Sequence, residues 1–137
     1  FFFIKSNVEV VNSYYVEDVI YFLEFEPYRN SMVGSLAYCI QKRVEVARAL
    51  TLGPELLLLD EPMAGMNVEE KEDMVRFIMD ILKERHITVI LVEHDLGVVM
   101  DISDQVFVLD FGELIGSGTP DEVAKSPKVI VAYIGEE

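Results

Sequence analysis

The sequence predicts an α/β fold in which helices flank a parallel β-sheet. Short apolar runs typical of strands alternate along the chain with segments whose apolar residues recur every three or four positions. Two of the predicted strands run directly into polar segments, Asp60-Glu61-Pro62 and Glu93-His94-Asp95. Because ligands bind at the carboxyl ends of strands in open α/β sheets, both segments are candidate functional sites.

Length and composition indicate one modest, folded domain. The chain has 137 residues, of which 51% are hydrophobic, and this is enough to form a packed core. No apolar stretch reaches the roughly 18 residues needed to span a bilayer, so we expect a soluble, cytoplasmic protein. The single cysteine, Cys39, excludes an internal disulfide and fits a reducing compartment.

The charge balance is strongly acidic. Lysine and arginine total 11, aspartate and glutamate total 25, and the formal net charge is −14. Such a chain repels phosphate backbones, so we expect no nucleic-acid partner. The acidic run at residues 69–73 is more typical of a solvated helix face than of a binding site.

The first part of the chain is expected to be helical. Residues 1–15 show no clear pattern and stay unassigned. Residues 16–25 predict a helix that is broken by residues 27–30, and residues 41–51 predict a second helix that ends at Gly53-Pro54. The apolar face of the first helix consists of Val16, Val19, Ile20 and Leu23.

The central part predicts a buried strand followed by a capped helix. Leu56 to Leu59 is a short apolar run bounded by a turn and by Pro62, which favours a buried strand. Asn67 is expected to cap the next helix, with Glu70 completing a capping box. The predicted buried stripe of this helix is Met74, Val75, Ile78, Ile81 and Leu82.

The remaining elements continue the alternation. Ile87 to Val92 is β-branched and predicts a second buried strand. It is followed by a short helix near 96–102, a third strand from Val106 to Leu109, a turn at Phe111-Gly112, a hairpin arm from Glu113 to Ile115, and a short helix with Pro120 in its first turn.

The pair Asp60-Glu61 is the strongest chemical signal. A buried strand delivers both carboxylates to its C-terminal end, and Pro62 stops the strand there. Asp60 is suited to hold Mg²⁺, directly or through water, and Glu61 to orient and polarise an attacking water. The alternative is two surface acids in a loop after a strand.

Two further segments are candidate binding sites because of their positions next to a strand or a helix. His94 follows the second strand, where it could contact a γ-phosphate; the alternative is a lone surface or core histidine, with Asp95 as a helix N-cap. Ser35 to Leu50 predicts a loop that leads into a helix beginning at Gln41, where free N–H groups favour anions. The alternative there is an ordinary amphipathic helix.

The order of these three segments resembles the ATP-binding domain of ABC transporters, a P-loop NTPase fold. Asp60-Glu61-Pro62 looks like the end of the Walker B motif with its catalytic glutamate, and His94 matches the switch histidine. Ala64-Gly65-Met66-Asn67 is similar to the D-loop. The place of the signature motif is occupied by Leu36, Ala37, Tyr38, Cys39, Ile40 and Gln41.

Finer features resemble the ATP-binding subunits of branched-chain amino-acid importers. They lie in residues 25–30, 66–71 and the tail from Gly118 to Gly135. The resemblance implies three parts: an unassigned segment at 1–15, a partial ABC ATPase domain at 16–115, and a C-terminal extension at 116–137.

Two features depart from the family pattern. No Gly-x-x-x-x-Gly-Lys-Ser/Thr loop occurs, because no Gly-Lys pair exists in the sequence. In the signature, Ala37, Tyr38 and Cys39 replace the usual small residues, and Cys39 takes the place of a glycine. We therefore expect an incomplete P-loop sheet from a truncated product, a split subunit or a decayed copy, inactive by itself. The family's strand before the phosphate loop is also absent, unless residues 1–4 replace it.

The resemblance implies ATP and Mg²⁺ as cofactors. Glu61 and His94 are then catalytic, Asp60 supports Mg²⁺, residues 36–41 face the ATP of a partner subunit, and Ala64, Gly65 and Asn67 line the subunit interface. The implied partners are a second ATP-binding subunit and membrane permeases, which would hold the chain at the inner face of the cell membrane. The alternatives are a non-catalytic interaction module and, against the acidity of the chain, an ABC-type DNA-repair ATPase.

Overall fold

The computed structural model describes residues 7–134, with side chains from Ser13 to Tyr133, so the expectation for residues 1–4 lies outside it. The chain divides into two compact units, residues 1–92 and 93–137, and each is described by itself. The three parts implied by the family resemblance stay predictions, because a division into compact units does not test which segments belong to which functional part.

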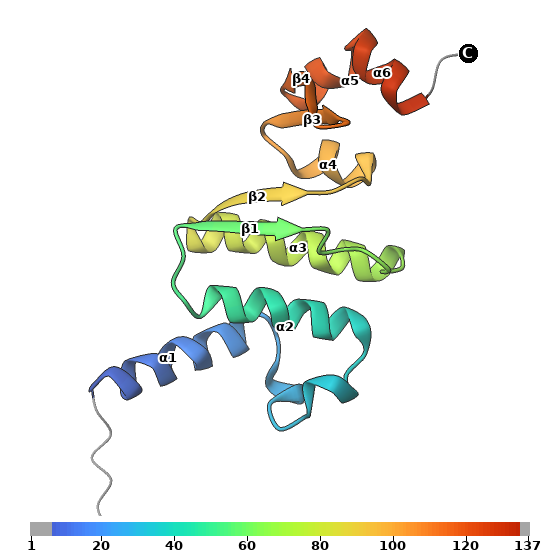
Figure 1. The fold of residues 1–137 in the computed structure, drawn as a ribbon. Coiled ribbons are helices and arrows are strands. Elements are labelled where there is room, and N and C mark those ends of the chain that lie inside the picture. Colours follow the sequence, from blue (N-terminus) through green and yellow to red (C-terminus); the bar gives the residue numbers. More distant parts are fainter. Residues whose placement is uncertain (1–6, 135–137) are drawn as a thin grey trace, which may run out of the picture. The chain divides into compact units, whose positions relative to one another are not determined.

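The first unit is a parallel two-stranded sheet with helices (Figure 1). Strands β1 (Leu56–Asp60) and β2 (Thr88–Val92) pair in parallel, with Leu57 opposite Val89 and Asp60 opposite Val92. Its elements are α1 (Asn7–Phe22), the short 3₁₀ helices η1 (Glu26–Tyr28) and η2 (Val33–Ser35), α2 (Tyr38–Leu50), β1 (Leu56–Asp60), α3 (Val68–Arg85) and β2 (Thr88–Val92).

Helix α1 extends further toward the N-terminus than the sequence pattern predicts. It begins at Asn7 and ends at Phe22, three residues before the predicted end. It ends because Glu24 adopts a left-handed backbone with a φ of 57°, which a helix cannot continue. Val19 and Leu23 are buried as predicted, whereas Val16 is exposed.

Helix α2 begins at Tyr38, so the prediction of a start at Gln41 is wrong. Ala37 has an extended backbone, and the Gln41 N–H donates to the Ala37 carbonyl at 3.0 Å, which closes the first helical turn. The Gln41 side chain then donates to the Leu36 carbonyl at 2.8 Å. Residues 38–41 are therefore helical rather than part of a loop.

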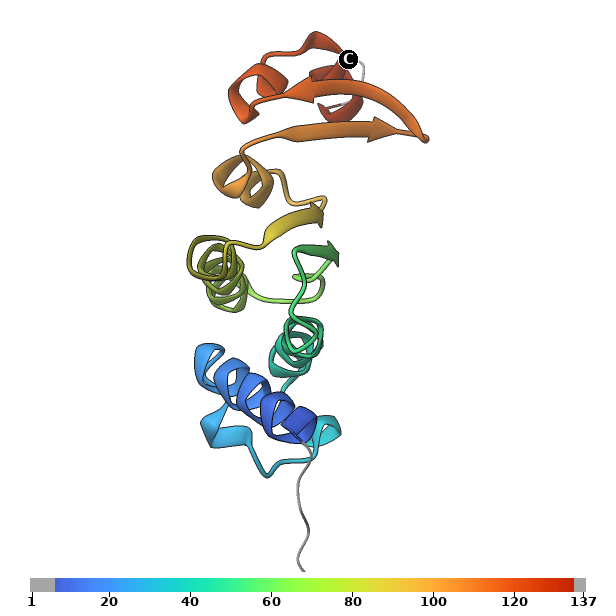
Figure 2. The same cartoon turned by 90° about the vertical axis from the view of Figure 1, so that its left-hand side faces the viewer.

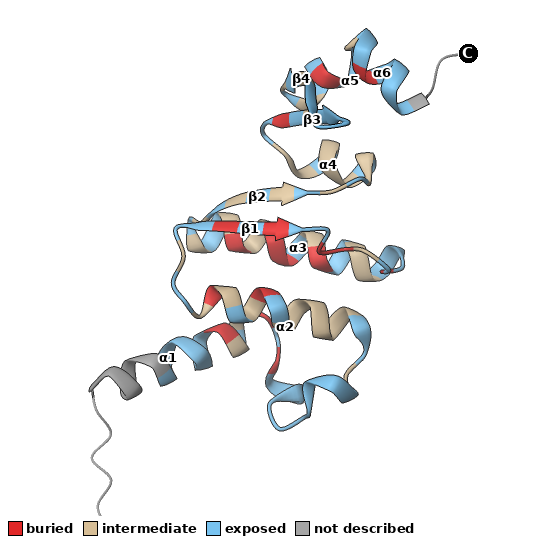
Figure 3. Ribbon diagram, viewed as in Figure 1, coloured by how far each residue is buried: buried red, intermediate tan, exposed pale blue. Residues whose placement is uncertain are grey.

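Helix α3 contributes more buried residues to the described core of this unit than any other element. The predicted capping box is confirmed: Asn67 Oδ1 accepts from the Glu70 N–H at 3.0 Å, and Glu70 Oε2 accepts from the Asn67 N–H at 2.9 Å. Its buried residues appear as a red stripe in Figure 3 and are Met74, Phe77, Ile78 and Ile81. Phe77 was not in the predicted stripe.

Only one face of the sheet is covered. Figure 2 shows α3 on one side of β1 and β2. Leu57 and Leu59 are buried, but Leu58 on the opposite face is 66% exposed and Ile90 is 53% exposed. The prediction of two buried strands is therefore wrong for this face, where the described side chains of Leu58 and Ile90 lie exposed.

The second unit contains an antiparallel hairpin with short helices. Its elements are α4 (Leu96–Ile102), β3 (Val106–Asp110), β4 (Glu113–Gly118), α5 (Pro120–Ala124) and α6 (Pro127–Ile134). The predicted hairpin is confirmed, and β4 continues to Gly118. The two turn residues, Phe111 and Gly112, have φ values of 44° and 84°, which suits a two-residue hairpin loop. Val106, Val123 and Val129 form the core.

Candidate functional site

Glu61 is held in an unusual backbone conformation at the end of β1. Asp60 is the last residue of the strand, and both acids are exposed. The Glu61 N–H donates to the Val92 carbonyl at 2.9 Å, so β2 still pairs with Glu61 beyond the strand. Its φ of 43° is left-handed, a conformation that costs a non-glycine residue about 1–3 kcal/mol and persists only where the surroundings impose it.

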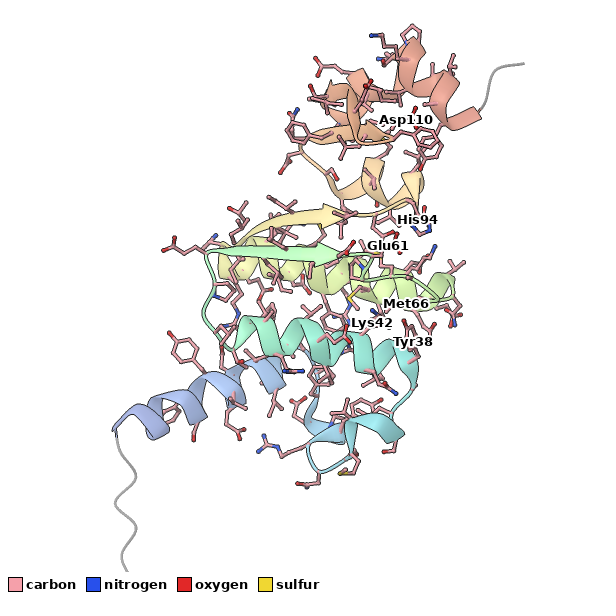
Figure 4. All side chains as sticks on the ribbon, in the orientation of Figure 1. Tyr38, Lys42, Glu61, Met66, His94 and Asp110 are labelled. Atoms are coloured by element: carbon pink, nitrogen blue, oxygen red, sulfur yellow. The ribbon has the colours of Figure 1, made fainter. Side chains whose placement is uncertain are left out.

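The loop after Glu61 is firmly anchored. Pro62, Met63 and Met66 are buried, and Met66, labelled in Figure 4, belongs to the loop that joins β1 to α3. The Ala64 N–H donates to the Glu61 carbonyl at 3.2 Å, and the Met66 N–H to the Met63 carbonyl at 3.2 Å. These contacts fix the path of the chain between Glu61 and the capping residue Asn67, so the carboxylate projects from a defined backbone.

The structure brings the signature-like and D-loop-like segments together. A Cβ added to Gly65, whose φ is 75°, would lie 3.4 Å from the Tyr38 ring, so the ring packs against this glycine. Lys42 Nζ lies 5.8 Å from the centroid of the same ring (Figure 4). In the first turn of α3, the Glu70 carboxylate accepts a hydrogen bond from the Cys39 thiol. Helix α2 thus touches the loop that carries Glu61.

The other predicted signature residues lie around this contact. Ala37 is exposed, and Leu36 and Ile40 are half-buried. Leu36 lines an apolar groove of about 250 Å³ between α1 and α2, together with Val19, Phe25 and Val44. Leu36 therefore faces its own unit, while the exposed positions of this segment are Ala37 and Tyr38.

Cys39 and Glu70 shift each other's ionisation in opposite directions. Burial, and then the hydrogen bond to Glu70 and its negative charge, raise the pKa of the Cys39 thiol. The Asn67 N–H, and then the Cys39 thiol, lower the pKa of the Glu70 carboxyl. At neutral pH the pair is therefore a thiol that donates to a carboxylate, and Cys39 is a poor nucleophile.

Replacing Glu70 with glutamine is expected to make Cys39 react faster with iodoacetamide at pH 8. The wild-type thiol ionises above its ordinary value of 9.0, and removal of the carboxylate charge lowers its pKa, so the thiolate is populated at lower pH. Glutamine preserves the capping box. The pH profile of alkylation measures the shift, with Glu72→Gln on the same helix as the control. An unchanged profile would contradict the Cys39–Glu70 contact.

His94 lies in the second unit, where its backbone is bonded on both sides. Its N–H donates to Glu93 Oε2 at 3.3 Å, and its carbonyl accepts from the Tyr133 hydroxyl at 2.7 Å. The predicted N-cap is confirmed, because the Asp95 side chain accepts from the Val98 N–H at the start of α4. The His94 side chain is exposed. Sequence reasoning missed Tyr133.

Asp60 is the acidic residue at the strand end whose chemistry suits Mg²⁺. Within residues 13–133, no three histidine, cysteine, aspartate or glutamate side chains gather into a potential metal cluster. Asp60 offers one exposed carboxylate at the strand end. Magnesium is commonly bound by one or two carboxylates together with substrate phosphates and water, which is the arrangement that Asp60 suits.

Comparison with known proteins gives the relationship. The family model described as "Branched-chain amino acid ATP-binding cassette transporter" matches residues 113–137. The high-affinity branched-chain amino acid transport ATP-binding protein BraF of Pseudomonas aeruginosa is 42% identical over 109 residues, which is 80% of this chain and 43% of BraF. LivG of Salmonella typhimurium is 41% identical over 78% of the chain and 42% of its own length. The resemblance to ABC-transporter ATP-binding subunits is confirmed.

Solved structures confirm the fold class as that of an ABC ATPase. The ADP conformation of MJ1267, an ATP-binding cassette of an ABC transporter, superposes with a TM-score of 0.81 at 30% identity. The match covers 91% of this chain and 50% of the MJ1267 chain. A putative metal-chelate type ABC transporter gives a TM-score of 0.84 over 95% of this chain and 51% of its own, and at 16% identity it supports the fold alone. The chain spans less than half the length of the curated relatives described above.

Proposed function

We propose that the chain supplies the catalytic carboxylate of an ABC-type ATPase that drives transport across a membrane. The observation that carries this proposal is the conformation of Glu61. Its left-handed backbone is tied to Val92 and followed by a buried loop, so its carboxylate stands at the carboxyl end of a parallel strand. The relatives are named as ATP-binding proteins, which supports ATP as the substrate.

In this mechanism Glu61 orients a water molecule and takes its proton as the water oxygen bonds to the γ-phosphorus. The bond from the γ-phosphorus to the bridging oxygen breaks, and ADP leaves with the electron pair. Asp60 would hold Mg²⁺, which neutralises charge on the phosphates. His94 would contact the γ-phosphate and stabilise the charge that develops there.

A second ATP-binding subunit completes the proposed site. Residues 36–41 would face the nucleotide of the partner subunit, and Ala64, Gly65 and Asn67 would line the interface. The packing of Tyr38 on Gly65 supports this arrangement, because it links the first turn of α2 to the loop beside Glu61. A nucleotide that moves the one segment would therefore also move the other.

Amino acids are the proposed cargo, because BraF and LivG are named for branched-chain amino acid transport. Within the described residues no helix has the length and apolarity to cross a membrane. Because the relatives are named as transport ATP-binding proteins, we also propose that permease subunits hold the chain at the inner face of the cell membrane.

A chimera tests the proposed function. In it the chain replaces the segment of BraF that it matches, so BraF provides the phosphate-binding loop that this sequence lacks. We expect the chimera to release phosphate from ATP at a rate well above that of the chain alone, which should not exceed the buffer rate. A folded chimera that is inactive beside active BraF, and that Cys39→Gly does not restore, would contradict the proposal.

A non-catalytic interaction module is the second candidate. Cys39 favours it, because its side chain occupies the place of a glycine in the signature-like segment. Under this alternative the chimera binds ATP without turnover, and Cys39→Gly does not restore turnover. If Cys39 alone impairs the site, Cys39→Gly restores it.

A further inference from the structure

Tyr133 joins the C-terminal helix to the backbone of His94. Its hydroxyl donates to the His94 carbonyl oxygen at 2.7 Å, across 39 residues of sequence and within the second unit. Nearly half of the Tyr133 surface is exposed, so the ring lies at the edge of the unit. Removal of the hydroxyl alone would therefore delete the hydrogen bond while leaving most of the ring packing in place.

Helix α6 holds this hydroxyl in a fixed place. Val129 is 4% exposed and packs in the core with Val106 and Val123. A Cβ on Gly116 would come within 2.8 Å of Val129 Cγ2, which shows that α6 lies directly on β4. Val129 and Tyr133 are four residues apart and so share one face of α6. Val129 thus holds α6 against the core, and Tyr133 contacts the His94 backbone from the same face of the helix.

The His94 segment is short and bonded at each end. Its N–H is held by Glu93 and the following Asp95 caps α4, which leaves the carbonyl as the remaining backbone group of His94. The hydrogen bond from Tyr133 fixes the peptide plane between His94 and Asp95. The direction in which the imidazole leaves the backbone depends on that plane.

We propose that Tyr133 is a positioning residue that sets the orientation of the His94 imidazole toward the γ-phosphate of a nucleoside triphosphate. Through this bond, the C-terminal helix α6 acts on the nucleotide site. The inference rests on the function proposed above, since it assumes that His94 meets the γ-phosphate. It adds a role for α6, which the comparison with relatives does not assign.

The hydrogen bond can be observed directly in the full chain. Of the two histidines, His94 precedes an aspartate and His86 precedes Ile87. A sample with carbonyl-¹³C histidine and ¹⁵N aspartate therefore gives a single HNCO peak, which reports the His94 carbonyl. Tyr133→Phe is expected to shift its ¹³C frequency, whereas Tyr21→Phe, at an exposed tyrosine of the first unit, should not. An unshifted peak in Tyr133→Phe would overturn the inference.

Kinetics of the BraF chimera test the role in catalysis. Tyr133→Phe is expected to lower kcat about fivefold with little change in KM for ATP. A roughly fivefold loss corresponds to the net contribution of one hydrogen bond that stabilises mainly the transition state. Unchanged kcat in a chimera that Glu61→Gln still inactivates would overturn the positioning role and leave the proposed function standing. Turnover that survives Glu61→Gln would refute the proposed function, and the positioning role with it.

Discussion

Replacing Glu61 with glutamine is expected to lower ATP turnover by about a hundredfold or more in the BraF chimera, while ATP still binds. Glutamine has nearly the same shape but cannot accept the proton of the attacking water. The left-handed backbone at Glu61 and its hydrogen bond to Val92 do not depend on the side-chain charge, so the loop should keep its conformation. Phosphate release measures turnover, and calorimetric titration measures binding.

Glu55 provides the matched control for this experiment. It lies directly before β1, at the opposite end of the strand from Glu61, and is also exposed. Glu55→Gln removes the same charge at the other end of β1 and should leave turnover within about twofold of the wild type, because surface charges away from a site have small effects. Wild-type turnover in Glu61→Gln would show that the catalytic carboxylate lies elsewhere.

Replacing Phe77 with alanine is expected to reduce the free energy of unfolding by about 3–5 kcal/mol. The Phe77 side chain is 1% exposed, so its removal leaves a cavity in the core of the first unit. The guanidinium groups of Arg43 and Arg76 lie 4.0 and 4.2 Å from the ring centroid, and both lose this cation–π contact. Arg43 keeps other contacts in the variant, because its Nη2 donates to the Leu23 carbonyl and its guanidinium lies 5.2 Å from the centroid of the Phe25 ring, so the cavity accounts for most of the expected loss.

Urea denaturation followed by circular dichroism measures this loss. Phe111→Ala is the control, because Phe111 stands fully exposed at the tip of the β3–β4 hairpin. We expect that control to change stability by no more than about 0.5 kcal/mol, as for other surface substitutions. A loss below about 1 kcal/mol in Phe77→Ala would contradict the described burial of Phe77.

Elements with local start and stop signals could be predicted from the sequence. The capping box at Asn67 and Glu70, the cap at Asp95 and the turn at Phe111-Gly112 each depend on residues close together in the chain. The start of α2 has no such signal. Ala37 has no side-chain acceptor, and its helix begins with contacts of Gln41 that propensity does not reveal.

Burial was predicted less well than secondary structure. The apolar runs of β1 and β2 suggested strands covered on both faces, but Leu58 and Ile90 lie exposed. The apolar residues of a strand show that it can be buried, but they do not show which of its two faces is covered by other elements. Phe77, in contrast, could have been found, because it lies three residues after Met74 and four before Ile81 on the buried face of α3.

The acidic part of the candidate site was predictable, and its supporting contacts were not. Asp60 and Glu61 follow a recognisable strand, so their position at its end follows from the chain alone. The packing of Tyr38 on Gly65 and the bond from Tyr133 to His94 join residues 27 and 39 positions apart. Such contacts depend on how helices pack against strands and loops. This packing produces no periodic pattern in a single sequence.

The most direct test of the proposed ATPase site is a crystal structure of the BraF chimera with Glu61→Gln, grown with ATP and Mg²⁺. We expect the substituted side chain at position 61 within hydrogen-bonding distance of a water in line with the γ-phosphorus, Asp60 on the Mg²⁺ directly or through water, and the His94 imidazole on a γ-phosphate oxygen. A well-ordered ATP whose γ-phosphate contacts none of these three positions would contradict the account.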